Sequence, residues 1–150
     1  MHQREKAQVL LVEDLFADGQ LMLRALKSKN LATEVHWVRD GAAALDFLLR
    51  TGEFAEDMPR TQLKLVLLDV KLPKVDGIEV LAKIKSTPAL RAVPVVMLTS
   101  SKEHRDVAQS YATGANSYIV KPVDFDQLID ALTTTLVYWM QYNYWPADEQ

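Results

Sequence analysis

The stretch KLVLLDVKLPKVDG, residues 64–77, places an unbroken run of aliphatic residues directly before an acid, Asp69. A run without polar alternation suits a strand that is covered on both faces, as in a parallel sheet layered between helices. An ionised carboxylate at the end of such a strand is costly unless it has a partner or a use. Asp69 is therefore the first candidate for a functional residue.

Four more stretches have the composition of strands: 9–12, 34–38, 93–98 and 118–120. Between the strand candidates, apolar residues recur at helical spacing. The last helix is expected to run from about residue 125 to residue 143, long enough to overhang the sheet. Strand and helix thus alternate five times, which predicts a doubly wound α/β domain with helices on both faces of a five-stranded parallel sheet.

The composition limits the class of protein. With 150 residues, 25% of them charged, the chain is long enough for one domain with a substantial core. Its 17 basic and 20 acidic side chains give a net charge of −3, which does not favour nucleic-acid binding. The sequence has no cysteine, no signal-peptide pattern and no apolar stretch of the roughly 20 residues needed to cross a bilayer. We expect a cytoplasmic protein with no membrane partner.

Polar side chains follow four of the strand candidates: Glu13 and Asp14, Asp69, Thr99, and Lys121. The carboxyl ends of parallel strands meet at one edge of the sheet, so we expect these groups to share a pocket. Clustered carboxylates repel one another unless a cation neutralises them, and an all-oxygen cluster favours Mg²⁺. Asp69 is then a candidate nucleophile that forms an aspartyl phosphate, while Lys121 and Thr99 stabilise the phosphoryl oxygens.

Each of these groups also has an ordinary explanation. A single acid after an apolar strand is more often a helix cap or an edge residue than a nucleophile. A single Lys-Pro pair is usually a turn, and an acidic pair is usually solvated. The placement of all four groups at the ends of alternating elements is what favours a site.

Four segments resemble the receiver domains of two-component response regulators: VLLVED, LVLLDVKLPKVDGIEVL, VPVVMLTSS and GANSYIVKPVD. The resemblance covers residues from about 7 to 131. It implies a flavodoxin-like (βα)5 three-layer sandwich with strand order 2-1-3-4-5. We expect a single domain over residues 1–150, with that core and a C-terminal helix extension over about 132–145.

The resemblance assigns a role to each group near the acid. It makes Asp69 the phosphoacceptor and Asp14 a Mg²⁺ ligand, with Glu13 binding directly or through water. The backbone carbonyl of Lys71 is implied as a further ligand. The protein is then a signalling phosphoacceptor rather than an enzyme, limited to self-phosphorylation and slow autodephosphorylation, and its partner is a sensor histidine kinase.

The resemblance also implies a switch. Thr99 is similar to the phosphoryl-sensing hydroxyl and Lys121 to the phosphate-pairing lysine, with the Lys121–Pro122 bond expected to be cis. Tyr118 lies where the family has its switch aromatic, although it also suits a half-buried residue of an edge strand. When Thr99 donates to the phosphate, Tyr118 is expected to rotate inward and change the surface formed by the fourth helix, fifth strand and fifth helix.

The chain departs from the family pattern in several places. Leu15 and Phe16 replace small or polar residues after the acidic pair, which predicts restricted access to the pocket. Lys71 adds an amine beside Asp69, where it is expected either to stabilise phosphate or to hinder a phosphatase. The long connection over 51–63 and the aromatic C-terminus resemble the stand-alone regulators paired with cyanobacterial bacteriophytochrome-type kinases, which suggests phytochrome light signalling.

Aromatic residues gather near the C-terminus, which is typical of interfaces. We expect no output domain after this helix, and we predict a homodimer through the fourth helix, fifth strand, fifth helix and C-terminal extension. Trp139 has the alternative of simply covering the core. The predicted interface residues are Tyr138, Trp139, Tyr142 and Trp145.

Two other functions remain possible at this point. One is a receiver-fold interaction module that signals by dimerisation without phosphate, although such a module is expected to lose Asp69 or Lys121, and both are present. The other is an aspartate-nucleophile phosphohydrolase on a related fold. That class typically has a second acid two residues after the nucleophile, where this chain has Lys71, so it is the least favoured.

Overall fold

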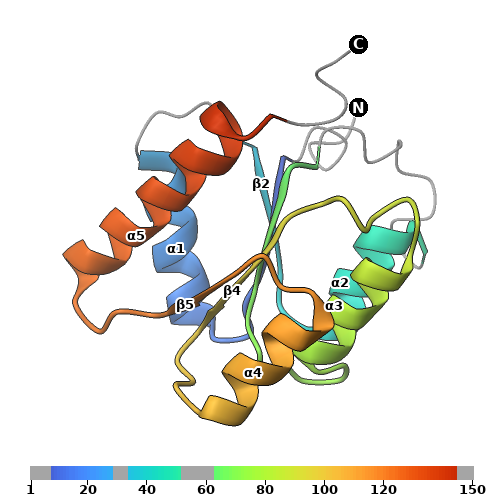
Figure 1. Cartoon of the computed structure of the whole chain (residues 1–150). Helices are drawn as coiled ribbons and strands as arrows, with labels where there is room; N and C mark the ends of the chain where they lie inside the picture. Colours follow the sequence, from blue (N-terminus) through green and yellow to red (C-terminus); the bar gives the residue numbers. More distant parts are fainter. Residues whose placement is uncertain (1–7, 29–33, 52–62, 145–150) are drawn as a thin grey trace.

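The computed structural model describes residues 8–28, 34–51 and 63–144, in which strands and helices alternate (Figure 1). Parallel pairing joins the strands in the order β2-β1-β3-β4-β5. The predicted doubly wound α/β fold and its strand order are confirmed. The elements are β1 (Val9–Val12), α1 (Phe16–Ser28), β2 (Val35–Val38), α2 (Gly41–Leu49), β3 (Leu65–Leu68), α3 (Gly77–Ser86), β4 (Val95–Thr99), α4 (His104–Thr113), β5 (Ser117–Val120), α5 (Phe125–Val137) and the π-helical turn η3 (Tyr138–Tyr142).

The aliphatic run of β3 is buried on both faces of the sheet. Val66 and Leu68 pack in the cluster that contains the buried side chains of α2 and α3. Leu65 and Leu67 point the other way, into the cluster that contains Met22 of α1 and buried residues of α5. Successive strand residues alternate between faces, and burying one such side chain contributes roughly 1.5–3 kcal/mol. The run needs no polar residue because neither face of the strand meets water.

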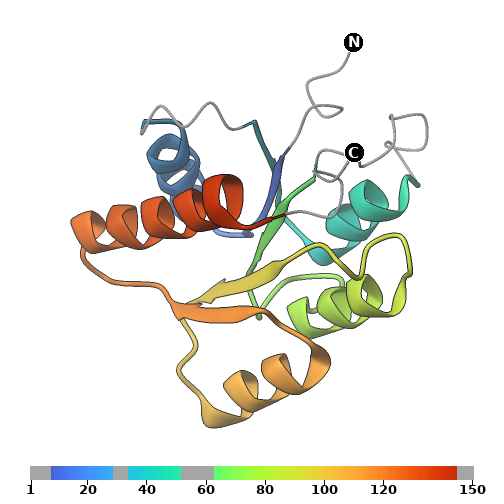
Figure 2. The same cartoon turned by 45° about the horizontal axis from the view of Figure 1, so that its top comes forward.

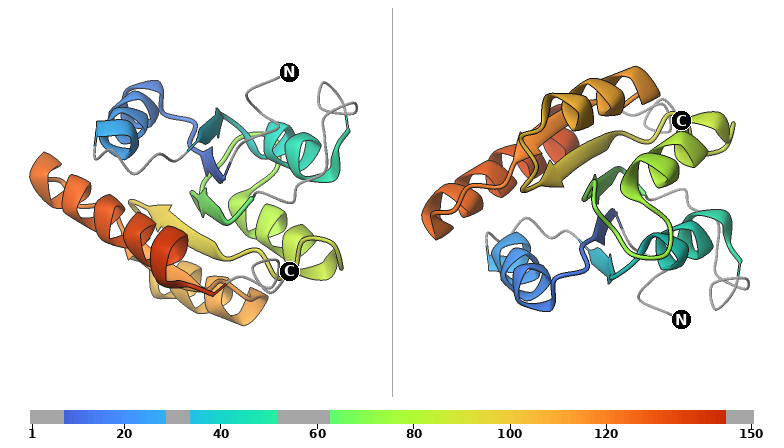
Figure 3. Two further views of the ribbon diagram at one scale, coloured as in Figure 1. Left: turned by 90° about the horizontal axis from the view of Figure 1, so that it is seen from above. Right: turned by 90° about the horizontal axis from the view of Figure 1, so that it is seen from below.

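The helices form the two outer layers of the molecule. Helices α1 and α5 lie side by side on one face, whereas α2 and α3 cover the other and α4 packs next to α3 (Figures 2 and 3). Within the described residues, no helix is both long enough and apolar enough to span a membrane.

The C-terminal helix is extended, as predicted, but its last turn is not α-helical. The backbone stays helical through Tyr138 and continues as a π-turn, closed by the Asn143 N–H, which donates to the Tyr138 carbonyl at 2.7 Å. Trp139 and Met140 pack against the core in this turn. The wider turn therefore keeps the core contacts going past the end of α5.

The end of the opening stretch is shaped by a close backbone approach. Asp76 caps α3 by accepting from the Ile78 N–H at 3.4 Å. A Cβ atom on the following Gly77 would lie 2.0 Å from the Asp69 carbonyl oxygen, so only glycine fits. The Gly77 N–H also donates to the Val70 carbonyl at 2.9 Å. The Asp-Gly pair thus pins the start of α3 against the strand end that carries Asp69.

At the opposite, amino-terminal end of the strands, one lysine bonds to several backbone and side-chain groups. The Lys85 ammonium at the end of α3 donates to the carbonyls of Arg91 and Val93 at 3.2 and 3.0 Å, and to Asn116 Oδ1 at 3.1 Å. Asn116 Oδ1 also accepts from the Val95 N–H at 2.9 Å. These bonds join α3, the start of β4 and the segment before β5.

Candidate functional site

Three carboxylates meet where β1 and β3 end. The strands pair in register, with Val12 opposite Leu68, so the residues that follow them are neighbours. Glu13, Asp14 and Asp69 each offer one oxygen, and these oxygens all lie within 4.8 Å of one another. Glu13 is 1% exposed, Asp69 is buried and Asp14 is half-buried. An all-oxygen donor set of this kind fits a hard divalent cation such as Mg²⁺.

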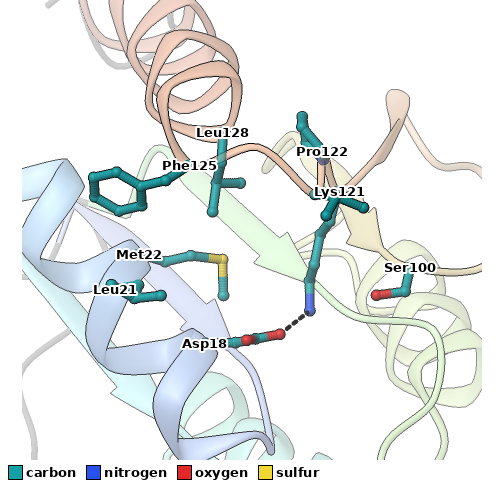
Figure 4. Close-up of a pocket in the computed structure, with 9 residues that line it drawn as sticks. Asp18, Leu21, Met22, Ser100, Lys121, Pro122, Phe125 and Leu128 are labelled. Atoms are coloured by element: carbon teal, nitrogen blue, oxygen red, sulfur yellow. Dashed lines mark hydrogen bonds and ion pairs between the residues drawn. The ribbon is translucent and has the colours of Figure 1, made fainter.

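The ammonium of Lys121, whose side chain is only 7% exposed, lies among these acids. It forms an ion pair with Glu13 Oε1 and lies 3.3 Å from Asp69 Oδ2. It also lies 3.4 Å from Asp18 Oδ2, the pair marked in Figure 4. The structure thus brings together one cation and the predicted acids at the carboxyl edge of the sheet.

Burial and ion pairing shift the pKa values of Lys121 and Glu13 in opposite directions. Burial alone lowers the pKa of Lys121, but its hydrogen bond to Glu13 and the charges of Asp69, Glu13 and Asp18 outweigh burial, so the pKa is raised. Burial raises the pKa of Glu13, and hydrogen bonds from Lys121 and the Leu15 N–H oppose that rise without cancelling it. Lys121 therefore stays charged at neutral pH and holds the acids together.

Asp18 is a member of this group that the sequence analysis missed. It lies in the first turn of α1, four residues after Asp14 in the sequence, and is half-buried. A lone acid in the first turn of a helix is usually explained by its favourable interaction with the helix dipole, so the contact of Asp18 with Lys121 was not expected.

A pocket of about 240 Å³ opens beside Lys121, between α1 and the start of α5 (Figure 4). In the figure the lysine side chain points away from Pro122 toward Asp18, across the pocket from Leu21 and Met22. The full lining is Asp18, Leu21, Met22, Ser100, Lys121, Pro122, Val123, Phe125 and Leu128.

The expected cis bond between Lys121 and Pro122 is wrong, because all peptide bonds of the described residues are trans. The Lys121 N–H donates to the Thr99 carbonyl at 2.8 Å, which continues the pairing of β5 with β4. The trans form is the lower-energy state of an X–Pro bond by about 0.5–1 kcal/mol. The long lysine side chain reaches Glu13 and Asp69 from this backbone without the cis bond.

Thr99 and Tyr118 are joined through the loop that follows β4. Thr99 is buried, and its Oγ1 accepts from the Ser101 N–H at 3.3 Å. The Tyr118 hydroxyl, on half-buried β5, donates to the Ser101 carbonyl at 2.9 Å. Burial raises the pKa of Tyr118, so the phenol keeps its proton and remains a donor. The two predicted switch residues therefore share one neighbour, Ser101, which sequence reasoning missed.

The backbone N–H and the side-chain ammonium of Lys71 have different partners. Its backbone N–H donates to Asp69 Oδ1 at 3.3 Å. Its ammonium lies 3.6 Å from Asp106 Oδ2 on α4, and the lysine side chain is 60% exposed whereas that of Asp106 is 5% exposed. Ser101 Oγ donates to the same Asp106 oxygen at 2.5 Å. Asp106 had no sequence signal, because a polar residue on a polar helix is expected to face water.

Leu15 and Phe16 are each more than half exposed, and neither lines the pocket beside Lys121. That they restrict access to the acidic site stays a prediction. Phe16 instead packs against Trp37, with ring centroids 5.7 Å apart. The Trp37 indole N–H donates to the Glu13 carbonyl at 2.9 Å, and the Arg39 guanidinium donates to the Asp14 carbonyl at 3.0 Å. These contacts hold the backbone of the acidic pair from the β2 side.

The predicted interface residues divide into three groups. Tyr138 and Tyr142 are exposed. Trp139 is half-buried against the core and meets Tyr138 edge-on, with ring centroids 4.8 Å apart. Trp145 lies outside the described residues, as does most of the long 51–63 connection.

Comparison with known proteins shows the family to which the chain is similar. Residues 9–133 match the response regulator receiver domain family. Over 139 residues the chain is 41% identical to the probable methanogenesis regulatory protein FilR2 of Methanothrix harundinacea, covering 93% of this chain and 87% of that protein. It is also 41% identical to the response regulator Rcp1 of Synechocystis sp., covering 93% and 92%.

Among solved structures, the chain is similar to the phosphorylated cyanobacterial phytochrome response regulator RcpA, with a TM-score of 0.85 and 39% identity. That match covers 92% of this chain and 96% of RcpA. The Mn²⁺-bound form of Rcp1 matches with a TM-score of 0.83 and 38% identity, covering 92% of this chain and 97% of that chain.

Proposed function

The chain belongs to the response regulator receiver domain family, and on this premise we propose that Asp69 accepts a phosphoryl group from a partner sensor histidine kinase in a Mg²⁺-dependent reaction. Receiver domains take phosphate from histidine kinases. The observation that carries the proposal is the convergence of Lys121 with Glu13 and Asp69 at the edge of the sheet. This pairs a candidate nucleophile with a fixed cation able to bind the transferred group.

In the proposed step, a carboxylate oxygen of Asp69 attacks the phosphorus of a phosphohistidine. A P–O bond forms and the P–N bond breaks; its electron pair leaves with the imidazole, which takes up a proton. Lys121 pairs with one phosphoryl oxygen, and Thr99 donates its hydroxyl to another. Hydrolysis reverses the state: water attacks the phosphorus and the P–O electron pair returns to the Asp69 carboxylate.

Mg²⁺ would be held by the carboxylates of Glu13, Asp14 and Asp69 and by the backbone carbonyl of Lys71. When bound, it offsets the charge of the acids and polarises the phosphoryl group. The spacing of the carboxylate oxygens and the Mn²⁺ in the related Rcp1 structure support a divalent ion here. With the ion bound, Lys121 would share Glu13 with it and stay beside Asp69.

The test is to incubate the protein with acetyl phosphate and Mg²⁺ and to measure the intact mass. We expect a gain of one phosphoryl group that requires Mg²⁺ and disappears in Asp69→Asn. The matched control is Asp126→Asn, which also removes one carboxylate but on the exposed first turn of α5. No adduct in the wild type, or an adduct that survives in Asp69→Asn, would overturn the proposal and favour a phosphate-independent interaction module.

The same site supports a switch through Thr99 and Tyr118. When Thr99 turns its hydroxyl toward the phosphate, the hydrogen bond from the Ser101 N–H is released and the loop after β4 moves. Tyr118 then exchanges its bond to the Ser101 carbonyl for an inward position. Tyr118→Phe removes that bond, so NMR shifts of β5 on phosphorylation should become smaller than in the wild type; unchanged shifts would exclude this role.

Exposed apolar residues surround the mouth of the site and suit a docked kinase. Leu21, Val123 and Phe125 are exposed beside the pocket next to Lys121. Phe125→Asp should slow phosphotransfer from a histidine kinase while leaving phosphorylation by acetyl phosphate unchanged. Equal slowing with both donors would contradict a docking role and indicate damage to the site itself.

We also propose a phytochrome as the kinase, because RcpA is described as a phytochrome response regulator and covers nearly this whole chain. The competing observation is the 41% identity to FilR2, whose name concerns methanogenesis and which matches as well as Rcp1 does. Phosphotransfer over short times from a purified phytochrome kinase should exceed that from a histidine kinase without a phytochrome sensor. Equal or reversed rates would overturn the assignment.

A homodimer is proposed on the surface of α4, β5, α5 and the C-terminal turn. The exposed Tyr111, Tyr138 and Tyr142 leave apolar area on that surface, and all of β5 is only half-buried. Sedimentation velocity should give a dimer mass for the wild type and a monomer mass for a Tyr138→Ser, Tyr142→Ser double variant. An unchanged mass would place the dimer contact elsewhere, and a monomeric wild type would refute it.

A further inference from the structure

Ser101 bonds directly to Thr99, Tyr118 and Asp106 around the site, through its backbone and its side chain. Its N–H donates to Thr99 and its carbonyl accepts from Tyr118. Its hydroxyl donates to Asp106 at 2.5 Å, and Asp106 forms the ion pair with Lys71 at 3.6 Å. A continuous polar path therefore leads from the loop beside Asp69 into α4.

The buried face of α4 is polar. Its buried residues are Asp106 and Ser110, one helical turn apart, and neither is apolar. The Ser110 hydroxyl is buried and makes no hydrogen bond within the described part of the chain. A helix with such a face gains little from hydrophobic burial, so its polar contacts decide where it rests.

We propose that the Lys71 ammonium alternates between Asp106 on α4 and the phosphoryl group on Asp69, so that phosphorylation releases α4 from this tether. The inference rests on the proposed phosphoacceptor function and gives Lys71 its role there. Lys71 is a positioning residue for α4 and a second cation for the phosphate.

The geometry allows this exchange. The Lys71 backbone is hydrogen-bonded to Asp69 Oδ1, which places the root of a long and mostly exposed side chain beside the acid. The side chain lines an open hollow together with Ser100, Ser101, Lys102 and Glu103. The charge of about −1.5 to −2 that a phosphoryl group brings exceeds that of the Asp106 carboxylate. The same ammonium then has a second anionic partner, and phosphate changes which of the two is favoured.

The exchange predicts that two variants change the affinity for a phosphoryl mimic in opposite directions. Lys71→Gln removes the second cation, so affinity for beryllofluoride, a phosphoryl mimic, should fall roughly two- to fivefold, the range of an exposed ion pair. Asp106→Asn removes the competitor for Lys71, so the affinity should rise by a similar factor. Both are measured by fluorine NMR of the bound mimic with Mg²⁺ present. The matched control is Lys102→Gln, a lysine of the same hollow without an ion pair among the described residues, which should leave the affinity unchanged.

The rate of hydrogen exchange at the α4 amides measures how firmly the Lys71–Asp106 ion pair holds the helix. With Mg²⁺ alone, the α4 amides should exchange roughly two- to fivefold faster in Lys71→Gln and in Asp106→Asn than in the wild type. Beryllofluoride should speed exchange in the wild type but add little in Lys71→Gln. An equal acceleration in Lys71→Gln, or affinities that move in the same direction in both variants, would overturn the proposal.

The outcomes separate the inference from the function beneath it. A wild type that binds no beryllofluoride refutes the phosphoacceptor function and removes the second partner of Lys71 with it. A wild type that binds the mimic while the two variants shift alike refutes the exchange alone.

Discussion

Helices α3 and α4 are equally long and pack side by side, yet they are held by different chemistry (Figure 1). Helix α3 buries the residues Gly77, Val80, Leu81 and Ile84. Helix α4 buries only Asp106 and Ser110. Apolar burial has no preferred partner and resists displacement, whereas an ion pair and a hydrogen bond can pass to a new partner. The comparison teaches that α3 is fixed to the sheet and α4 is held by contacts that another anion can take over.

The largest expected effect is on α3. Leu81→Ala removes a fully buried side chain and should lower the free energy of unfolding by about 3 kcal/mol, measured by urea denaturation. The control in α4 is Val107→Ala, at a half-buried position, which should cost less than about 1 kcal/mol. Equal losses in the two helices would remove the distinction between them.

The second effect concerns how the helices end. Gly114 caps α4 at a φ of 114°, and a Cβ there would also lie 3.0 Å from the Lys85 Cγ. Gly114→Ala should cost about 1–2 kcal/mol by the same denaturation measurement. Thr87 caps α3 in the extended region, so Thr87→Ser is the control and should stay within about 0.5 kcal/mol. A neutral Gly114→Ala would show that the end of α4 relaxes freely.

The third effect has the opposite sign. Ser110→Ala removes a buried hydroxyl without a described partner and should raise the free energy of unfolding by about 1 kcal/mol. Ser86→Ala, an exposed hydroxyl on α3 that donates to the Lys83 carbonyl, is the control and should change stability by less than about 0.5 kcal/mol. A destabilised Ser110→Ala would mean that this hydroxyl has a partner after all.

The smallest effect is on salt dependence. Because the Lys71 side chain is mostly exposed, its pair with Asp106 is screened by salt, and raising NaCl to about 1 M should speed amide exchange in α4 by less than about twofold. Exchange in α3 should not change, since its buried contacts are apolar. Parallel changes in both helices would point to a general salt effect on the protein instead.

The sequence predicted the strands best where the core leaves no choice. β1 and β3 match their apolar runs because every residue in them is buried. β4 begins later than expected: the Val93 N–H donates to Leu90 in the preceding turn, and Pro94 has no N–H to pair. The last turn of the C-terminal helix was predicted as α-helix and is a π-turn, from which Trp139 packs against the core.

The site was predictable where residues directly follow strands. Glu13, Asp69 and Lys121 converge because the sheet register brings strand ends together, whatever the helices do. Asp18 and Asp106 were not predictable, since their partners depend on how α1 and α4 are rotated and on the path of the loop after β4. The cis form of the bond before Pro122 was carried over from the family resemblance, and the bond is trans.

The indole of Trp37 gives the molecule an optical reporter of its own. Its N–H is bonded to the Glu13 carbonyl, and its ring lies against Phe16 and near the Arg39 guanidinium. Indole emission responds to nearby charge and to hydrogen bonding, so a change among the carboxylates should shift the emission wavelength of Trp37. Occupancy of the site can therefore be followed in the unlabelled protein, in real time, by fluorescence.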